Sequence, residues 1–176
     1  GRLVHRKGQD TLVEALPEIL QSHPNAHLLF VGVGPHLEYI HKRAIQLGVL
    51  EHISFVGRVQ YRELPRFICV GEIFAMPSRS RLAGLEVEGL GIVYLEASAC
   101  GLPVVGGLSG GAPDALLEGE TGLAVDGLAP NQVAAAINSL LADPERARAM
   151  GARGRQWIID EWEWQHWSQR FNELLH

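Results

Sequence analysis

The chain has 176 residues, of which 47% are hydrophobic and 20% are charged, and its formal net charge is −5. This length suits one domain with a substantial core, and the composition is ordinary for a soluble globular protein. No group of lysines and arginines is dense enough for a nucleic-acid-binding surface, and no apolar run reaches the ~18 residues of a membrane-spanning helix. These features argue against a membrane-spanning helix within these residues and against a nucleic-acid partner.

The first residues, GRLVHRKG, resemble a loop that follows a strand, although no strand precedes them in the sequence. We therefore expect a fragment, the C-terminal portion of a longer protein. A central place in its sheet would then stand empty, and a second copy of the chain could fill it, because unpaired strand edges invite association.

Short apolar runs alternate with segments of helical periodicity along the chain. A capping box, Thr11 to Glu14, predicts the start of the first helix, and Pro17 predicts a kink or an early end. The predicted strands cover residues 26–32, 53–57, 73–77, 103–107 and 122–126. The predicted helices cover 11–21, 36–47, 61–70 (interrupted by Pro65), 91–100, 111–118, 130–142, 144–159 and 164–175.

This alternation predicts an α/β fold, a Rossmann-like parallel sheet with helices on both faces. Each strand ends in, or one residue before, glycine or proline, where the carboxyl edge of a parallel sheet must turn. Ligands of such sheets bind at that edge.

Two turns are candidates for binding phosphate. Residues 31–38, VGVGPHLE, offer G-x-G but have Leu37 in place of a third glycine, so a dinucleotide fingerprint is weak and a tight turn is the better interpretation. Residues 1–8 carry Arg2, Arg6 and Lys7 just before a helix, where amides, helix dipole and cations all favour an anion. A solvated basic loop is the alternative for this segment.

Residues 86–96, EVEGLGIVYLE, hold three glutamates around two glycines. Eight residues of one helix would separate Glu88 from Glu96 by roughly 12 Å, whereas hydrolytic carboxylate pairs need about 5–9.5 Å. The spacing therefore favours a role in which the two carboxylates bind different parts of one extended ligand, with phosphate between them. Glu86 is interpreted as surface charge.

Glu88-Gly-Leu-Gly-Ile-Val-Tyr-Leu-Glu96, followed by CGLPVV, SGGAPD and ETGLAV and preceded by GRLVHRKG, resembles the nucleotide-sugar lobe of family 4 retaining glycosyltransferases. The closest branch is that of the GDP-mannose-dependent phosphatidylinositol-mannoside mannosyltransferases, although many members of the family carry Phe where this chain has Leu90. The resemblance covers nearly the whole chain. It implies one donor-binding domain over residues 1–176, the C-terminal half of a GT-B fold whose N-terminal acceptor domain lies outside the chain.

The resemblance also implies roles for particular residues. Arg2 and Lys7 would hold the donor diphosphate, Glu88 would contact the donor sugar, and Glu96 would bind the ribose. The catalytic set is then Arg2, Lys7 and Glu88, and the donor-binding set is Gly1, Arg2, Lys7, Gly57, Arg58, Val59, Glu88, Gly91, Ile92, Val93 and Glu96.

The implied reaction is transfer of a hexose from GDP-mannose to a lipid or glycan acceptor bound mainly by the other domain. The chain has no Asp-x-Asp pair to hold a metal on the diphosphate, so we expect metal-independent transfer without a cofactor. A UDP-sugar donor and a nucleotide-binding module without activity of its own are the alternatives. No signal peptide is recognisable, and we expect a cytoplasmic enzyme, with the full-length protein peripheral at the inner face of a membrane.

The tryptophans, cysteines and histidines are interpreted mainly as structural residues. The tryptophans at positions 157, 162, 164 and 167 are expected to pin a C-terminal helix to the core. Cys69 and Cys100 are interpreted as buried reduced thiols, with a disulfide left open. The eight histidines show no paired metal spacing, and His5 is a candidate for ligand contact because it lies inside the basic loop.

Overall fold

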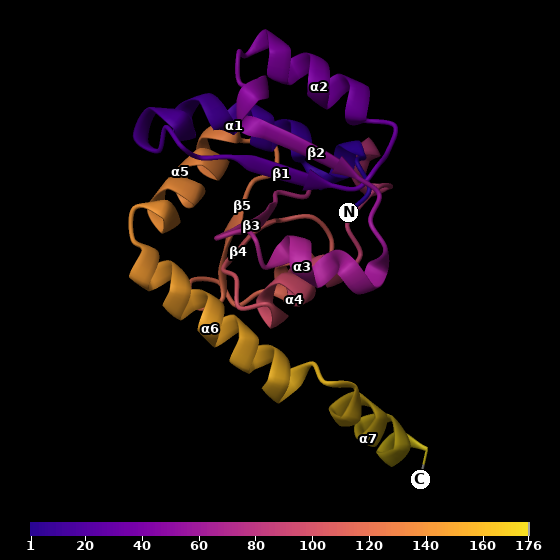
Figure 1. Cartoon of the computed structure of the whole chain (residues 1–176). Coiled ribbons are helices and arrows are strands. Elements are labelled where there is room, and N and C mark those ends of the chain that lie inside the picture. Colours follow the sequence, from indigo (N-terminus) through magenta and orange to yellow (C-terminus); the bar gives the residue numbers. More distant parts are fainter. Residues whose placement is uncertain (176) are drawn as a thin grey trace.

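The computed structural model describes residues 1–175 and confirms an α/β fold with parallel strands (Figure 1). The strands are β1 (Leu28–Val31), β2 (Ile53–Gly57), β3 (Phe74–Met76), β4 (Val104–Gly107) and β5 (Gly122–Val125). The helices are α1 (Gln9–Ser22), α2 (Leu37–Gln46), α3 (Leu64–Ile68), α4 (Ile92–Ala99), α5 (Pro130–Leu141), α6 (Pro144–Glu161) and α7 (Trp164–Leu174).

The five strands form two separate hydrogen-bonded sheets. β1 pairs with β2, and β3, β4 and β5 pair in that order, every pair being parallel. Among the described residues no ladder joins β1 to β3. The two half-sheets are therefore held together by side chains and loops.

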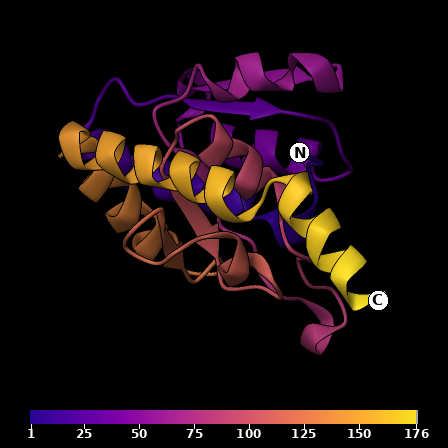
Figure 2. The ribbon, with the colours of Figure 1, turned by 90° about the horizontal axis from the view of Figure 1, so that it is seen from below.

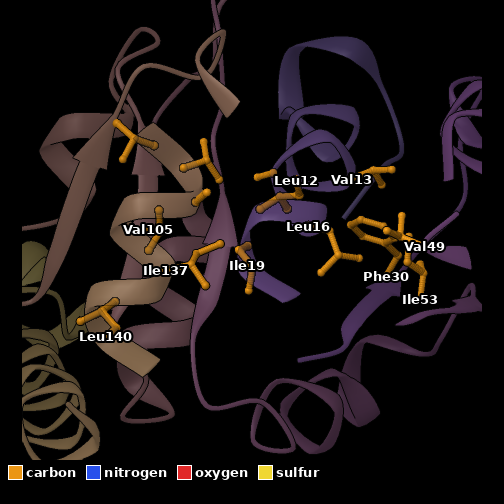
Figure 3. Close-up of a cluster of buried hydrophobic side chains, with 14 of the residues drawn as sticks. Leu12, Val13, Leu16, Ile19, Phe30, Val49, Ile53, Val105, Ile137 and Leu140 are labelled. Carbon is orange, nitrogen blue, oxygen red and sulfur yellow. The ribbon is translucent and has the colours of Figure 1, made fainter. Parts of the chain in front are cut away.

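Helix α1 supplies the core that joins the two halves. Figure 3 shows its side chains Leu12, Leu16 and Ile19 between two groups of apolar residues, Val105, Ile137 and Leu140 on one side and Phe30, Val49 and Ile53 on the other. Leu12, Leu16 and Ile19 are each at most 3% exposed. A second cluster, around Tyr94, Met76 and Val104, lies between α4 and the β3–β5 sheet.

The predicted capping box at Thr11 is wrong. Helix α1 begins two residues earlier, with Gly8 as its cap at a φ of 71°, and Thr11 is a buried helical residue whose hydroxyl donates to the Gly127 carbonyl at 2.8 Å. Pro17 lies inside the helix without ending it, since α1 continues to Ser22.

Two short segments also differ from the prediction. Pro65 is in the first turn of α3, where a missing N–H has no cost, so it begins this helix instead of interrupting one. The helix predicted at 111–118 is only a 3-10 turn, Ala112–Ala115, that ends in extended backbone at Leu116.

The C-terminal helices leave the body of the molecule. Figures 1 and 2 show α6 running across the fold and α7 continuing beyond it. Trp157 on α6 is buried, but α7 has no buried residue and Trp164 is 88% exposed. The expectation that the tryptophans pin the last helix to the core is therefore wrong for α7: its Trp167 instead packs on Trp162, the C-cap of α6, with ring centroids 6.1 Å apart. Within residues 1–175, no helix combines the length and apolar character that crossing a membrane requires.

Candidate functional site

The basic loop between Gly1 and Gly8 lies at the carboxyl edge of the sheet. Residues His5–Lys7 form one 3-10 turn, and Gly8 ends it in the left-handed region. A Cβ atom at Gly8 would lie 2.1 Å from the Pro77 carbonyl oxygen, so only glycine allows the loop to meet the end of β3. The amide of Arg79 donates to the Arg6 carbonyl at 2.8 Å, which ties the loop to the same edge.

Lys7, Glu88 and Arg6 converge at this edge. The Lys7 Nζ atom lies 3.0 Å from Oε2 of Glu88, and Arg6 Nε lies 3.6 Å from the same oxygen. Glu88 is 6% exposed, so its charge is buried but has two cationic neighbours. Two of the predicted catalytic residues, Lys7 and Glu88, are thus brought into direct contact.

The Glu88 carboxylate still lacks a hydrogen bond. Oε2 is buried and has no donor with hydrogen-bond geometry among the described residues, and neither has Arg6 Nε an acceptor. A buried carboxylate oxygen left in this state costs free energy until a donor reaches it. A ligand hydroxyl at this position would supply that donor.

Backbone contacts fix the turn that carries Glu88. The Glu88 amide donates to Ser109 Oγ at 3.0 Å, and the Gly111 amide donates to the Gly89 carbonyl at 2.7 Å. Gly110, with a φ of 57°, passes so close that a Cβ atom would lie 1.9 Å from the Glu88 carbonyl oxygen. The glycines of SGG therefore serve to hold the EGLG turn in place.

Gly91 caps α4 with a φ of 76°, and a Cβ there would lie 2.5 Å from the Tyr94 ring. The Tyr94 side chain is fully buried, and its hydroxyl donates to the Met76 carbonyl at 2.6 Å and lies 3.0 Å from Ser78 Oγ, whose hydroxyl can donate to it. Burial, only partly offset by these hydrogen bonds, raises the pKa of Tyr94. The first amides of α4, those of Ile92 and Val93, have no acceptor within their helix, as in any helix start.

Glu96 lies one turn into α4 and is half-buried. Burial lowers the pKa of the Gly1 amino group, and Lys7 lowers it further, while the negative charge of Glu96 opposes them. No ion pair joins Glu96 to Lys7 or to Glu88 within residues 1–175, and its role as a second contact to the ligand stays a prediction.

Arg2 lies on the other side of Gly1, toward β2. It lines a shallow hollow of about 260 Å³ together with Arg58, Val59 and Tyr61. Gly57 ends β2 directly before these residues, and its carbonyl accepts from the Gly32 amide at 2.7 Å. The predicted donor-binding residues thus form a row along one edge, from Arg58 through Gly1 to Lys7 and Glu88.

A buried polar network lies behind the basic loop. Arg79 Nη2 donates to Asp10 Oδ2 at 2.6 Å and Arg79 Nη1 donates to Thr11 Oγ1 at 2.7 Å. His36 Nε2 lies 3.4 Å from the same Asp10 oxygen, and the His36 ring packs on His5 with centroids 3.5 Å apart. Burial opposes ionisation of Asp10, but its hydrogen bond and ion pair with Arg79 hold the pKa of that carboxyl below its usual range.

His5, Asp10 and His36 could together hold a metal ion, because their ligand atoms lie within 4.8 Å of one another. The guanidinium of Arg79 already neutralises the aspartate, however, and a second cation would compete with it. The expectation of a site without metal stays a prediction.

The structure also shows site residues that the sequence interpretation missed. Arg6 contacts both Glu88 and Glu86, and Arg81 Nη1 lies 2.8 Å from Glu86 Oε2. Glu86 is therefore a paired, half-buried residue of the site wall rather than free surface charge. Arg6 was named as a cation of the basic loop but was left out of the predicted donor-binding set, whereas Arg79 and Arg81 carry no local signal.

The cysteines are free, but neither is fully buried, so that part of the prediction is wrong: Cys69 is exposed and Cys100 is half-buried. Burial and the neighbouring Cys69 thiol raise the pKa of Cys100 to about 11.

The sequence and the fold were compared with known proteins. Residues 1–157 match the family described as "Glycosyl transferases group 1". The chain is 53% identical over 175 residues to a GDP-mannose-dependent alpha-(1-6)-phosphatidylinositol monomannoside mannosyltransferase of Mycolicibacterium smegmatis, covering 99% of the chain and 46% of that protein. It is 44% identical to the corresponding monoacylated-substrate enzyme of Corynebacterium glutamicum, covering 45% of it.

Solved structures agree with this match. The fold superposes on sucrose-phosphate synthase from Thermosynechococcus elongatus with a TM-score of 0.85 at 30% identity, covering 99% of the chain and 43% of that protein. HepE of Anabaena, solved in complex with UDP, gives a TM-score of 0.87 at 23% identity, over 99% of the chain and 46% of that protein. The chain spans less than half the length of the curated relatives it matches. A family match over residues 1–157, together with a relative that is 53% identical, shows that this chain belongs to the glycosyl transferases group 1 family.

Proposed function

We propose that this chain is the donor-binding, C-terminal half of a retaining glycosyltransferase, and that its nucleotide-sugar is GDP-mannose. The observation that carries the proposal is the buried Glu88 carboxylate, held against Lys7 with one oxygen that lacks a hydrogen bond. Relatives that are 53% and 50% identical to the chain are named as GDP-mannose-dependent mannosyltransferases, which supports GDP-mannose over other nucleotide-sugars as the donor.

The basic loop would hold the diphosphate. An ammonium has three N–H donors. Lys7 donates one to Met76 Sδ at 3.6 Å and stands 3.0 Å from Glu88 Oε2 without hydrogen-bond geometry, which leaves N–H donors for a phosphate oxygen. Arg2 is exposed at the neighbouring hollow, and its planar guanidinium could donate two hydrogen bonds to the same phosphate.

The α4 start and its two glutamates would hold the rest of the donor. The amides of Gly91, Ile92 and Val93 face developing negative charge at a helix N-terminus. Glu88 would accept from a hydroxyl of the sugar and Glu96 from the ribose diol, as acidic residues do in dinucleotide sites. The base would lie in the hollow along Gly57, Arg58 and Val59.

These positions suggest how the chain would assist transfer. The diphosphate gains negative charge as the bond to the sugar breaks, and fixed cations and amides that meet this charge lower the barrier. Lys7, Arg2 and the α4 amides would do so without a metal ion. The acceptor, a lipid or glycan, would bind mainly to the part of the full-length enzyme outside this chain, which we propose acts at a membrane surface.

Two experiments test the proposal. Calorimetry with the purified chain should show binding of GDP and GDP-mannose that is at least about tenfold tighter than binding of UDP and UDP-glucose; tighter binding of the uridine compounds would overturn the choice of donor. The full-length protein should transfer labelled mannose from GDP-mannose to phosphatidylinositol monomannoside, and full binding without transfer to any lipid or glycan acceptor would favour a nucleotide-binding module.

A further inference from the structure

Cys69 and Cys100 end two neighbouring helices. Cys69 is the C-cap residue of α3, and Cys100 is the C-cap residue of α4. The strands that follow these helices, β3 and β4, pair in parallel with Phe74 opposite Val104. Both helices therefore end at the amino edge of the same sheet, opposite to the edge that carries the candidate site, and Figure 1 shows α3 beside α4.

Contacts on both sides of the cysteines hold the two segments together. Ile68, directly before Cys69, packs in the same apolar cluster as Cys100. Beyond the cysteines, a Cβ atom at Gly71 would lie 4.0 Å from Cδ1 of Leu102. The thiols are close enough to act on each other: burial raises the pKa of Cys100, and the side chain of Cys69 raises it further, to about 11. The fold thus brings together two cysteines that are far apart in the sequence.

The two thiols differ in their access to solvent. Cys69 is exposed, whereas Cys100 is half-buried and holds its proton more firmly. A small reagent can therefore reach Cys69 first. Cys100 needs only a small thiolate fraction to react at the Cys69 sulfur, because the two atoms are held together and need not meet by diffusion. An accessible thiol next to a second, resolving thiol is the arrangement of redox-sensitive cysteine pairs.

We propose that Cys69 and Cys100 are a redox modification site that forms a reversible disulfide, and that the oxidant is a small-molecule disulfide of the glutathione type. The Cys69 thiolate attacks one sulfur of this reagent, so that a mixed disulfide forms and one reagent thiolate leaves. The Cys100 thiolate then attacks the Cys69 sulfur and expels the second reagent thiolate. The two protons of the cysteines end on the two released thiols, the cysteines are oxidised and the reagent is reduced.

The disulfide would join the far ends of two helices that begin at the candidate site. Leu64, the first residue of α3, lines the hollow together with Arg58. Helix α4 carries Glu96, whose carbonyl accepts from the Cys100 amide at 3.2 Å. The cross-link would fix α3 against α4, and it would stabilise the fold by restricting the unfolded chain. The inference rests on the two cysteines and is independent of the proposed function.

The test exposes the folded full-length protein to oxidised glutathione and locates the modified cysteines by peptide mapping. The parent protein is compared with Cys69→Ser and Cys100→Ser, and Cys100→Ala serves if serine is not tolerated at the half-buried position. Circular dichroism before and after oxidation checks that each protein stays folded. Oxidation in concentrated urea supplies the reference for the unfolded chain.

In the folded parent, a peptide pair linked through Cys69 and Cys100 should form, and dithiothreitol should separate it. The Cys100 variant should instead accumulate glutathione on Cys69, because the resolving thiol is missing. In Cys69→Ser, glutathione should react with Cys100 at least about tenfold more slowly than the link forms in the parent. The oxidised parent should also melt at a higher temperature than the reduced parent, with no such shift in either variant.

Glutathione on Cys69 of the folded parent without a linked pair would overturn the proposal. So would two cysteines that both stay reduced, or a link that forms only in urea. Reaction of Cys100 in Cys69→Ser as fast as link formation in the parent would contradict the assignment of Cys69 as the attacking thiol.

Discussion

Lys7 and Glu88 form an ion pair across the carboxyl edge of the sheet, with side chains only 12% and 8% exposed. Since the pair is screened from water, its charges act strongly on anything bound beside it. In the full-length enzyme, Lys7→Ala should lower turnover about 10²–10³-fold if Lys7 stabilises the departing diphosphate as an oxyanion donor does.

The control for this variant is Lys42→Ala. Lys42 is the other lysine of the chain, is 67% exposed and pairs with Glu38 on the surface of α2, so its loss should leave turnover unchanged. Undiminished turnover of the Lys7→Ala enzyme would contradict the assigned role.

Replacing the two glutamates should have different effects on the binding of GDP-mannose and of GDP. Glu88→Gln should weaken GDP-mannose binding about tenfold or more and leave GDP binding nearly unchanged, because Glu88 is assigned to the sugar. Glu96→Gln should weaken both ligands, because both contain the ribose. Calorimetry measures the dissociation constants of both ligands for both variants, with Glu51→Gln, at an exposed position, as the control. An equal loss of GDP affinity in the Glu88 and Glu96 variants would refute the division of roles.

Metal removal should leave transfer intact. In the proposed function, the cations of the basic loop would neutralise the diphosphate in place of a divalent ion. Mannose transfer by the full-length enzyme, measured after dialysis against EDTA, should equal transfer without chelator. Activity that disappears with EDTA and returns with Mg²⁺ or Mn²⁺ would show that these cations are insufficient.

The Tyr94 hydroxyl should matter for stability. Tyr94→Phe leaves the buried Met76 carbonyl and Ser78 hydroxyl without this partner, and we expect a loss of about 1–3 kcal/mol in the free energy of unfolding. Tyr61→Phe is the matched control, since Tyr61 is 79% exposed. Denaturant unfolding of both variants measures the difference, and similar midpoints would show that the hydroxyl network contributes little.

The Asp10–Arg79 pair should make stability depend on pH. Because the pKa of Asp10 is lowered in the folded state, its contribution is present above the unfolded pKa of about 3.9 and is lost as the pH falls through the folded value. Asp10→Asn should therefore destabilise the protein at pH 7, and the difference from the parent should shrink below about pH 4. Urea midpoints across this range test the sign; a difference that grows in acid would contradict it.

Much of the fold could be predicted from the sequence because its signals are local. Apolar runs ended by glycine, proline or serine located all five strands, and helical periodicity located α1, α2, α4, α5 and α6 to within a few residues. The parallel arrangement followed from their alternation. The split of the sheet between β1 and β3 was anticipated only as an empty place, without its position.

The errors arose where tertiary contacts override local patterns. Thr11 looks like a cap, but its hydroxyl is used by Gly127, which is 116 residues away in sequence. Glu86 looks like surface charge, but Arg6 and Arg81 reach it from separate segments. The resemblance implied separate roles for Lys7 and Glu88, whereas their contact with each other, and Arg79 behind them, could be found only in three dimensions.

The position of α1 between the two half-sheets has a consequence for how the protein unfolds. With no main-chain ladder from β1 to β3 in the described part of the chain, the apolar coupling between the halves passes through Leu12, Leu16 and Ile19. Loosening these three side chains would therefore let each half melt at its own temperature, so that a single transition becomes two.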